Sequence, residues 1–173
     1  GNNSTGTASY PVFVIKPSGG DLGDIKLLVS GFDHSCAINS SSDSLCWGAK
    51  TGENGAQSNV ARVVQNSQNS IMIGAGQYHT CVLKNDKKVY CLGSGGGGHN
   101  LGEENAEDRW SLPASGILQD VVDISSKVTT TCAIKGSDNH VSCWGYGGEG
   151  ALGNNEGSDS QVPVSVIGVG EDP

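Results

Sequence analysis

The sequence predicts an all-β domain of short antiparallel strands, on the basis of its glycine content, its internal repeats and its alternating apolar pattern. Gly accounts for 27 of the 173 residues, whereas aromatic residues make up 5% and charged residues 16%. Glycine destabilises a helix interior by roughly 1 kcal/mol per position, so this composition disfavours long helices. Short strands joined by many turns fit it better.

Three stretches of the chain share one plan. Each contains a cysteine followed by a small or β-branched residue and an aliphatic residue, then a polar turn, then a second cysteine followed by Trp-Gly or Leu-Gly. A Gly-rich loop and a short apolar strand near a proline complete the unit. This self-similarity predicts one repeat domain over 1–173, with the tail of a preceding repeat over 1–24 and three repeats over 25–70, 71–120 and 121–173.

The apolar pattern within each repeat has a period of two. His34, Cys36 and Ile38 share one face of a predicted strand, and Val89 and Cys91 share one face of another. Such alternation is typical of β-strands, and the turn-forming residues between the cysteines predict a hairpin. We therefore expect four short strands per repeat, with the longest loop after the third. A fourth copy of the last strand, over 10–15, precedes the first repeat and could pair with the last blade of its own chain or of a neighbour.

These motifs resemble the regulator of chromosome condensation repeat over nearly the whole chain. The matching features are Gly-x-x-His-[Ser/Thr]-Cys, Val-x-Cys-Trp-Gly, Gly-x-x-Gly-x-Leu-Gly and Pro-Val-x-Val. The resemblance implies three four-stranded antiparallel blades of a β-propeller plus one leading strand, in a cysteine-containing extracellular variant. The sequence departs from the pattern at Ala61, Leu92, Lys127 and Thr130, which replace Pro, Trp, Gly and His respectively.

The cysteines occur as two per repeat, on neighbouring strands of one hairpin and on the same face. Opposed residues of antiparallel strands lie close enough for a disulfide. The repeat symmetry selects one pairing: Cys36 with Cys46, Cys81 with Cys91, and Cys132 with Cys143. The alternative is three pairs of buried thiols in a reducing cytosol. Disulfides predict an extracellular, cell-surface or periplasmic location.

The charge balance and the lack of long apolar runs exclude several partners. With 10 basic and 18 acidic residues the net charge is −8, which disfavours nucleic acid and anionic membrane surfaces. No run is long enough to insert in a membrane. Cysteine and histidine spacing predicts no metal site, and the acidic loops lack the usual calcium spacing. We expect no cofactor.

No combination of nucleophile, base and acid emerges from the sequence, so we expect no enzymatic activity. His34 and His79 recur at one position of the repeat, which favours a structural role. The candidate ligand-binding residues are instead loop residues: His99, Arg109 and Trp110 in the second repeat and Tyr146 in the third. Trp and Arg are typical interface anchors. The alternative for Trp110 is that it opens the fourth strand and packs between blades.

The favoured function is an extracellular, non-enzymatic recognition module, part of a surface or adhesin-like protein that binds a protein or glycan. The resemblance also implies two alternatives, a secreted inhibitor or regulator of an enzyme such as a β-lactamase, and guanine nucleotide exchange with chromatin binding. The acidic charge and the cysteine pairs disfavour the second alternative. A purely structural spacer is a further alternative. Because three blades leave end faces bare, the chain is part of a larger propeller, an open stack, or a homo-oligomer that buries those faces.

Overall fold

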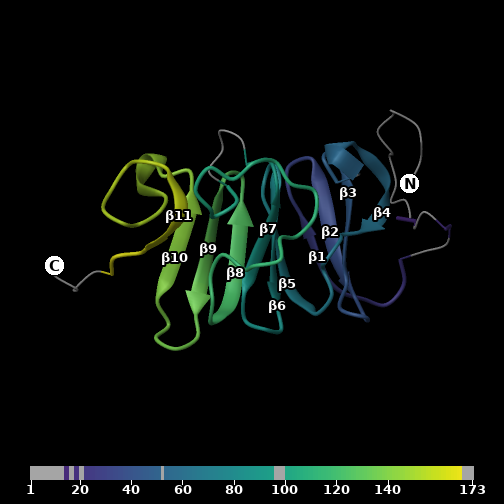
Figure 1. The fold of residues 1–173 in the computed structure, drawn as a ribbon, viewed down its shortest axis with the longest axis horizontal. Helices are drawn as coiled ribbons and strands as arrows, with labels where there is room; N and C mark the ends of the chain where they lie inside the picture. The colour runs from purple at the N-terminus through teal and green to yellow at the C-terminus, as the bar shows by residue number, and fades with distance from the viewer. Residues whose placement is uncertain (1–13, 16–17, 20–21, 52, 96–99, 169–173) are drawn as a thin grey trace.

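The computed structural model describes residues 14–15, 18–19, 22–51, 53–95 and 100–168. They form three antiparallel sheets that stand side by side in a row, so the all-β prediction is confirmed (Figure 1). In chain order the elements are β1 (Ile25–Ser30), β2 (His34–Asn39), β3 (Ser44–Gly48), η1 (Glu53–Gly55), β4 (Ser58–Val63), β5 (Ser70–Ala75), β6 (His79–Lys84), β7 (Val89–Gly93), β8 (Val121–Lys127), β9 (Thr130–Lys135), β10 (Val141–Gly145), η2 (Gly148–Gly150) and β11 (Ser160–Ser165).

Each sheet is a meander whose strands follow one another in sequence order. The orders are β1-β2-β3-β4, β5-β6-β7 and β8-β9-β10-β11, and every adjacent pair is antiparallel. Tight turns close the hairpins where the sequence places polar residues. Between β6 and β7, for example, Asp86 Oδ1 accepts a hydrogen bond from the Lys88 amide at 3.1 Å, and Lys87 has a φ of 60°. We call the sheets the first, second and third blades.

The second blade differs from the expected four strands. Its fourth position is filled by two isolated bridges, one between Gly93 and Arg109 and one between Val89 and Leu118. Between them, Leu112 is turned toward the first blade, where its amide donates to Gln65 O at 3.2 Å. Leu112 is buried, and the proline that follows it has no N–H for a sheet ladder. Packing against the first blade therefore replaces the fourth strand.

The predicted leading strand lies mostly outside the described residues. At its end, Ile15 forms an isolated bridge, and Ile15 O accepts a hydrogen bond from the Ala61 amide of β4 at 3.0 Å. The end of this segment thus pairs with the outer strand of the first blade. Ile15 therefore does not pair with the last blade of the same chain, which was one of the possibilities that the sequence had left open.

All three predicted disulfides are present, so the predicted pairing is confirmed. They join Cys36 to Cys46, Cys81 to Cys91, and Cys132 to Cys143. In each bridge the two cysteines are direct partners on adjacent strands, with Cα atoms 4.1 Å apart. Each bridge therefore fixes the second and third strands of its own blade and leaves the blades unlinked to one another.

The blades pack face to face, and the cysteine-bearing face of one blade covers the opposite face of the next. Between the first and second blades the buried cluster is Cys36, Ile38, Cys46, Val64, Ile73, Val82, Tyr90, Leu92 and Leu112. Between the second and third blades it is Cys81, Leu83, Val89, Cys91, Leu101, Val121, Ile124, Ala133 and Trp144. The first two disulfides thus belong to the core, and both faces of the second blade are covered.

Candidate binding site at the loop end

The antiparallel order of the strands brings two loops of every blade to one end of the molecule. These are the loop between the first and second strands and the loop that follows the third strand, which contains η1 or η2 in the outer blades (Figure 1). Backbone hydrogen bonds tie the two loops together in each blade: Ala49 N to Asp33 O, Ser94 N to Tyr78 O, and Tyr146 N to Thr129 O, at 2.8–3.0 Å. We call this end the loop end.

Exposed aromatic side chains gather at the loop end. Phe32, Tyr78 and Tyr146 are 70%, 38% and 48% exposed, and they are the exposed aromatic residues of the described part of the chain. Val128, 50% exposed, belongs to the same set of loops. At the opposite end the exposed apolar side chains at the starts of the inner strands are aliphatic: Ile25, Ile71 and Val122. Aromatic enrichment is typical of interface centres, so the loop end is the better candidate surface.

The loops of successive blades form one continuous surface. The Phe32 amide donates to Gly76 O at 3.2 Å, and the Gln77 amide donates to Val128 O at 2.6 Å. Lys50 Nζ lies 4.7 Å from the centre of the Tyr78 ring, which links the first and second blades by a cation–π contact. A ligand on this surface would therefore meet side chains from more than one blade.

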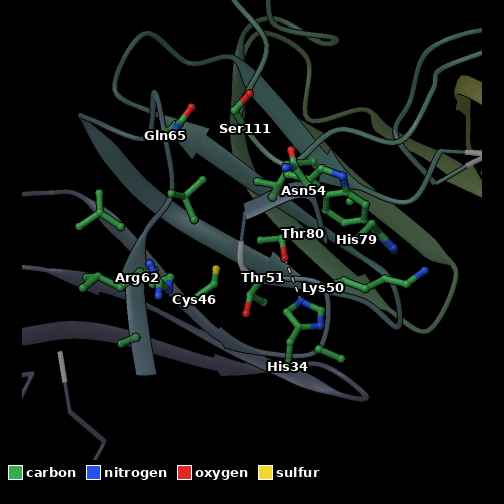
Figure 2. A pocket seen from close by; sticks show the side chains of 18 of the residues that line it. His34, Cys46, Lys50, Thr51, Asn54, Arg62, Gln65, His79, Thr80 and Ser111 are labelled. Carbon is green, nitrogen blue, oxygen red and sulfur yellow. Dashed lines mark hydrogen bonds between the residues drawn. The ribbon is translucent and has the colours of Figure 1, made fainter. Parts of the chain in front are cut away.

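A cavity of about 680 Å³ opens between the first and second blades beside these loops (Figure 2). Its lining includes Lys50, Asn54, Arg62, Gln65 and Trp110. Lys50 and Arg62 are the charged side chains among the described lining residues, in a protein whose net charge is −8. Within the described ranges neither has a carboxylate in ion-pair contact. The cavity therefore offers two cations, an indole and amides, a set suited to an anionic ligand with polar groups.

Trp110 fits beside this cavity because the first blade has a glycine where a side chain would collide with the indole. Gly55 has a φ of +76°, and a Cβ at this position would lie 2.5 Å from Trp110 Cζ2. The indole thus packs closely on the backbone of the η1 loop and is half-buried. Trp110 lies between loops of the first and second blades and also faces the cavity.

The structure places the four sequence-predicted residues in different settings. Trp110 lines the cavity, whereas Tyr146 is exposed on the third blade and does not line it. Arg109 anchors its own loop, because its guanidinium contacts Glu103 Oε2 at 2.7 Å and its backbone pairs with Gly93. His99 lies outside the described residues. The described members of this set are thus not assembled into a single site.

Sequence reasoning missed Phe32, Tyr78 and Lys50. Phe32 and Tyr78 stand in the turn just before the His-[Ser/Thr]-Cys motif, where apolar side chains in a polar turn are the available signal. Lys50 follows the Trp-Gly-Ala stretch of the first repeat and carries no motif. Their clustering depends on how neighbouring blades stack, which a single repeat does not reveal.

His34 and His79 serve the packing between blades. His34 Nε2 lies 2.8 Å from Thr80 Oγ1, the contact drawn in Figure 2, and His79 Nε2 lies 2.8 Å from Thr131 Oγ1. Burial lowers the pKa of His34, an effect that Asp33 partly opposes. Burial, with a smaller contribution from His34, lowers the pKa of His79 to about 4. Both imidazoles are therefore neutral at pH 7 and are held between blades, away from solvent.

Neither a metal cluster nor a membrane-spanning helix occurs in the described part of the chain. Among these residues, no group of three or more His, Cys, Asp or Glu side chains is arranged to hold a metal ion. Over the same ranges, no helix has the length and apolar character needed to cross a membrane.

The fold and the repeated geometry define a class of protein, a stack of β-propeller blades with one disulfide in each. A family model for the regulator of chromosome condensation (RCC1) repeat matches residues 73–99. The human probable E3 ubiquitin-protein ligase HERC4 is 28% identical over 151 residues, which is 82% of this chain and 14% of that protein. The chain is therefore built from RCC1-type repeats, and it spans a small part of this relative.

Solved structures agree on the fold. Prp20p from Saccharomyces cerevisiae is 17% identical, with a TM-score of 0.71 over 88% of this chain and 41% of that one. Human WBSCR16 is 18% identical, with a TM-score of 0.70 over 86% of this chain and 42% of that one. At identities this low, the similarity shows that the blades are arranged in the same way.

Proposed function

We propose that the protein is an extracellular, non-enzymatic recognition module, part of a surface or adhesin-like protein, that binds a protein or glycan through its loop end. The observation that carries this proposal is the exposure of Phe32, Tyr78 and Tyr146 on adjoining loops of three blades. Exposed apolar groups that gather on one surface mark interaction sites. The rigid blades below would hold these side chains in fixed positions, which limits the entropy lost on binding.

The disulfides support the extracellular setting. Three bridges in a chain of 173 residues, each joining strands of one small sheet, are typical of proteins that fold under oxidising conditions. The structural neighbours support a binding role for such a platform, since yeast Prp20p binds Gsp1p and histones. The partners of this chain would instead be those that an oxidising, extracellular setting offers.

The loop end is tested by screening the purified protein on arrays of extracellular proteins and of glycans. We expect the double variant Phe32→Ser with Tyr146→Ser to lose binding at least about tenfold, because two exposed anchors at the loop end are removed. The matched control is Ile71→Ser with Val122→Ser, which removes apolar side chains 48% and 46% exposed at the opposite end. Binding that survives the loop-end changes but fails in the control would place the site at the other end and refute the proposal.

The cavity between the first and second blades makes a separate prediction about the same ligand. Lys50→Gln with Arg62→Gln should weaken binding severalfold and flatten its dependence on salt, because both cations face the cavity without a carboxylate partner in the described chain. The control Lys87→Gln with Lys135→Gln removes the same charge from hairpins at the opposite end, where each lysine already lies beside a carboxylate, Asp120 and Asp138 respectively. Titrations at low and high salt check this, and equal effects of the two variants would exclude the cavity from the site.

A further inference from the structure

The cavity between the first and second blades lies where the other interface between blades is filled. Between the second and third blades, Trp144 and Leu101 are buried in one cluster, and Trp144 Nε1 donates to Asn100 O at 3.2 Å. The corresponding positions of the first interface hold Leu92 and Gln57. Leucine is smaller than tryptophan, and the Gln57 side chain is exposed. Part of the apolar volume that fills one interface is therefore missing from the other.

The sequence and the backbone support this correspondence. Leu92 and Trp144 each come directly before the glycine of positive φ that ends the third strand of their blade. Gln57 completes a Gly-Ala-Gln sequence at the end of η1, as Leu152 completes a Gly-Ala-Leu sequence at the end of η2. Leu152 and Leu101 both precede a glycine of positive φ. Because protein interiors are close-packed, a cavity of about 680 Å³ at this place is a departure that a ligand can use.

Arg62 places a cation on the face of the first blade that borders this cavity. It is the direct partner of Cys46 on the adjacent strand, so its side chain lies on the face that packs against the second blade. In the third blade the partner of Cys143 is Val164, an apolar residue. Arg62 Nε donates to Ser58 Oγ at 3.1 Å, which orients the guanidinium. Such a planar cation binds a carboxylate or a similar oxyanion through two parallel hydrogen bonds, so this side chain favours an anionic group.

The cavity also offers an indole and three side chains that both donate and accept hydrogen bonds. The indole of Trp110 packs closely on Gly55 and lines the cavity. The face of an aromatic ring carries partial negative charge, and the C–H groups on one face of a sugar ring carry partial positive charge, so the two pack together. Asn54, Gln65 and Ser111 line the same cavity (Figure 2), and their amides and hydroxyl can pair with sugar hydroxyls.

We infer that the cavity binds an acidic sugar, a saccharide unit that carries a carboxylate or sulfate group. This inference deepens the proposed recognition function and rests on it, because it names the class of ligand. Arg62 and Lys50 would bind the anionic group, and the indole of Trp110 would pack on the ring. The volume is in the range of small-ligand pockets, so it suits about one or two sugar rings rather than a folded protein partner.

Calorimetric titration of the purified protein with short oligosaccharides tests this inference. The probes are an oligogalacturonide, a sulfated glycosaminoglycan fragment and a neutral glucan oligosaccharide of the same length. We expect at least one acidic probe to bind at least about tenfold more tightly than the neutral one, because charge-assisted hydrogen bonds are stronger than neutral ones. A preference between the acidic probes shows which anionic group the cavity takes. Equally tight binding of the neutral probe or of polyglutamate, or no binding of any probe, would overturn the inference.

Filling the cavity gives the sharpest variant. Leu92→Trp with Gln57→Leu introduces the residue types of the other interface, so it should abolish saccharide binding without lowering the melting temperature. The second variant, Arg62→Val, introduces the residue type of the third blade and should weaken binding at least about tenfold. Arg62 is exposed, so this change leaves the buried packing intact. Lys135→Val is the control, because it removes the same charge from a hairpin at the opposite end, and it should bind as the wild type does.

The outcomes separate this inference from the proposed function. If the cavity variants lose saccharide binding and Phe32→Ser with Tyr146→Ser keeps it, the inference holds and the loop end is not the site for this ligand. If no saccharide binds but the loop-end variant loses a protein partner, the inference fails and the proposed function holds. A folded filled variant that still binds the acidic probe would also overturn the inference. If the filled variant does not fold, as judged by circular dichroism, Arg62→Val decides, and an effect equal to that of Lys135→Val counts against the cavity.

Discussion

Replacing Cys81 and Cys91 together by alanine is expected to lower the free energy of unfolding by about 4 kcal/mol. The bridge joins residues ten apart in sequence, for which the chain-entropy model gives about 2.5–3 kcal/mol. Both cysteines are also fully buried in the cluster between the second and third blades, so removing the sulfur atoms leaves a cavity that costs about 1 kcal/mol more. Urea unfolding of both proteins at pH 7 measures the difference.

The third bridge provides the matched control. Cys132 and Cys143 are eleven residues apart, so the entropic contribution is nearly the same. Cys143 is 3% exposed, but Cys132 is only half-buried, and neither belongs to a cluster between blades. Their replacement by alanine should therefore cost less, about 3 kcal/mol. The more accessible bridge should also be the first to react with dithiothreitol. A larger loss for this pair than for Cys81 and Cys91 would contradict this difference in packing.

The free energies that the disulfides contribute limit the redox conditions under which the protein can remain folded. Single domains are stable by about 5–15 kcal/mol, so three bridges of about 2.5–3 kcal/mol each make up much of the total. In the described chain two clusters between blades form most of the remaining core. Reducing conditions should therefore leave the chain close to unfolding, which agrees with the proposed extracellular setting.

The sequence was sufficient to predict the blades and their bridges because both depend on local periodicity. The alternation around Cys36, repeated around Cys81 and Cys132, determines strand, face and register within a hairpin. Direct opposition of the paired cysteines follows from that register. The repetition added a check, because a strand or cysteine pair assigned in one repeat could be compared with the same positions in the other two.

What could not be predicted depends on contacts between repeats. The fourth strand of the second blade is broken because Leu112 packs against the first blade, a contact that no pattern within the second repeat encodes. Likewise, Lys127 and Thr130 depart from the repeat pattern in sequence. What the pattern residues do becomes clear only in the structure, where His79, at the position equivalent to Thr130, reaches Thr131 of the next blade. The gathering of Phe32 and Tyr78 at one end also follows from stacking rather than from spacing.

Acidification should destabilise the protein through His79. Its pKa is about 4 in the folded protein, below the ordinary value of 6.5 that applies when the chain is unfolded, so the unfolded state takes up the proton first. The stabilisation is therefore complete above pH 6.5 and is lost as the pH falls toward 4, by about 3 kcal/mol in total. His34, whose pKa is lowered in the same direction, adds to the loss.

The variant His79→Gln isolates this contribution. Glutamine can still hydrogen-bond to Thr131 but takes up no proton, so the variant should be less stable at pH 7 and should lose less stability on acidification than the wild type. His140→Gln is the control, because this imidazole is 62% exposed and lies in a hairpin turn. Urea unfolding at several pH values between about 4.5 and 7.5 gives the free energy of unfolding against pH for the wild type and the two variants. In this range the unfolded chain takes up a proton on His79 before the folded protein does.

The physical reason for this pH dependence lies in the interface between the second and third blades. His79 Nδ1 is buried and has no hydrogen-bond partner, while Nε2 already contacts Thr131. The protonated imidazole carries an N–H on both nitrogens, so it would place a charge and an unpaired Nδ1–H in the core, which favours separation of the two blades there. Parallel curves for His79→Gln and the wild type would show that the proton enters elsewhere, and the blades would then not be coupled to pH through this contact.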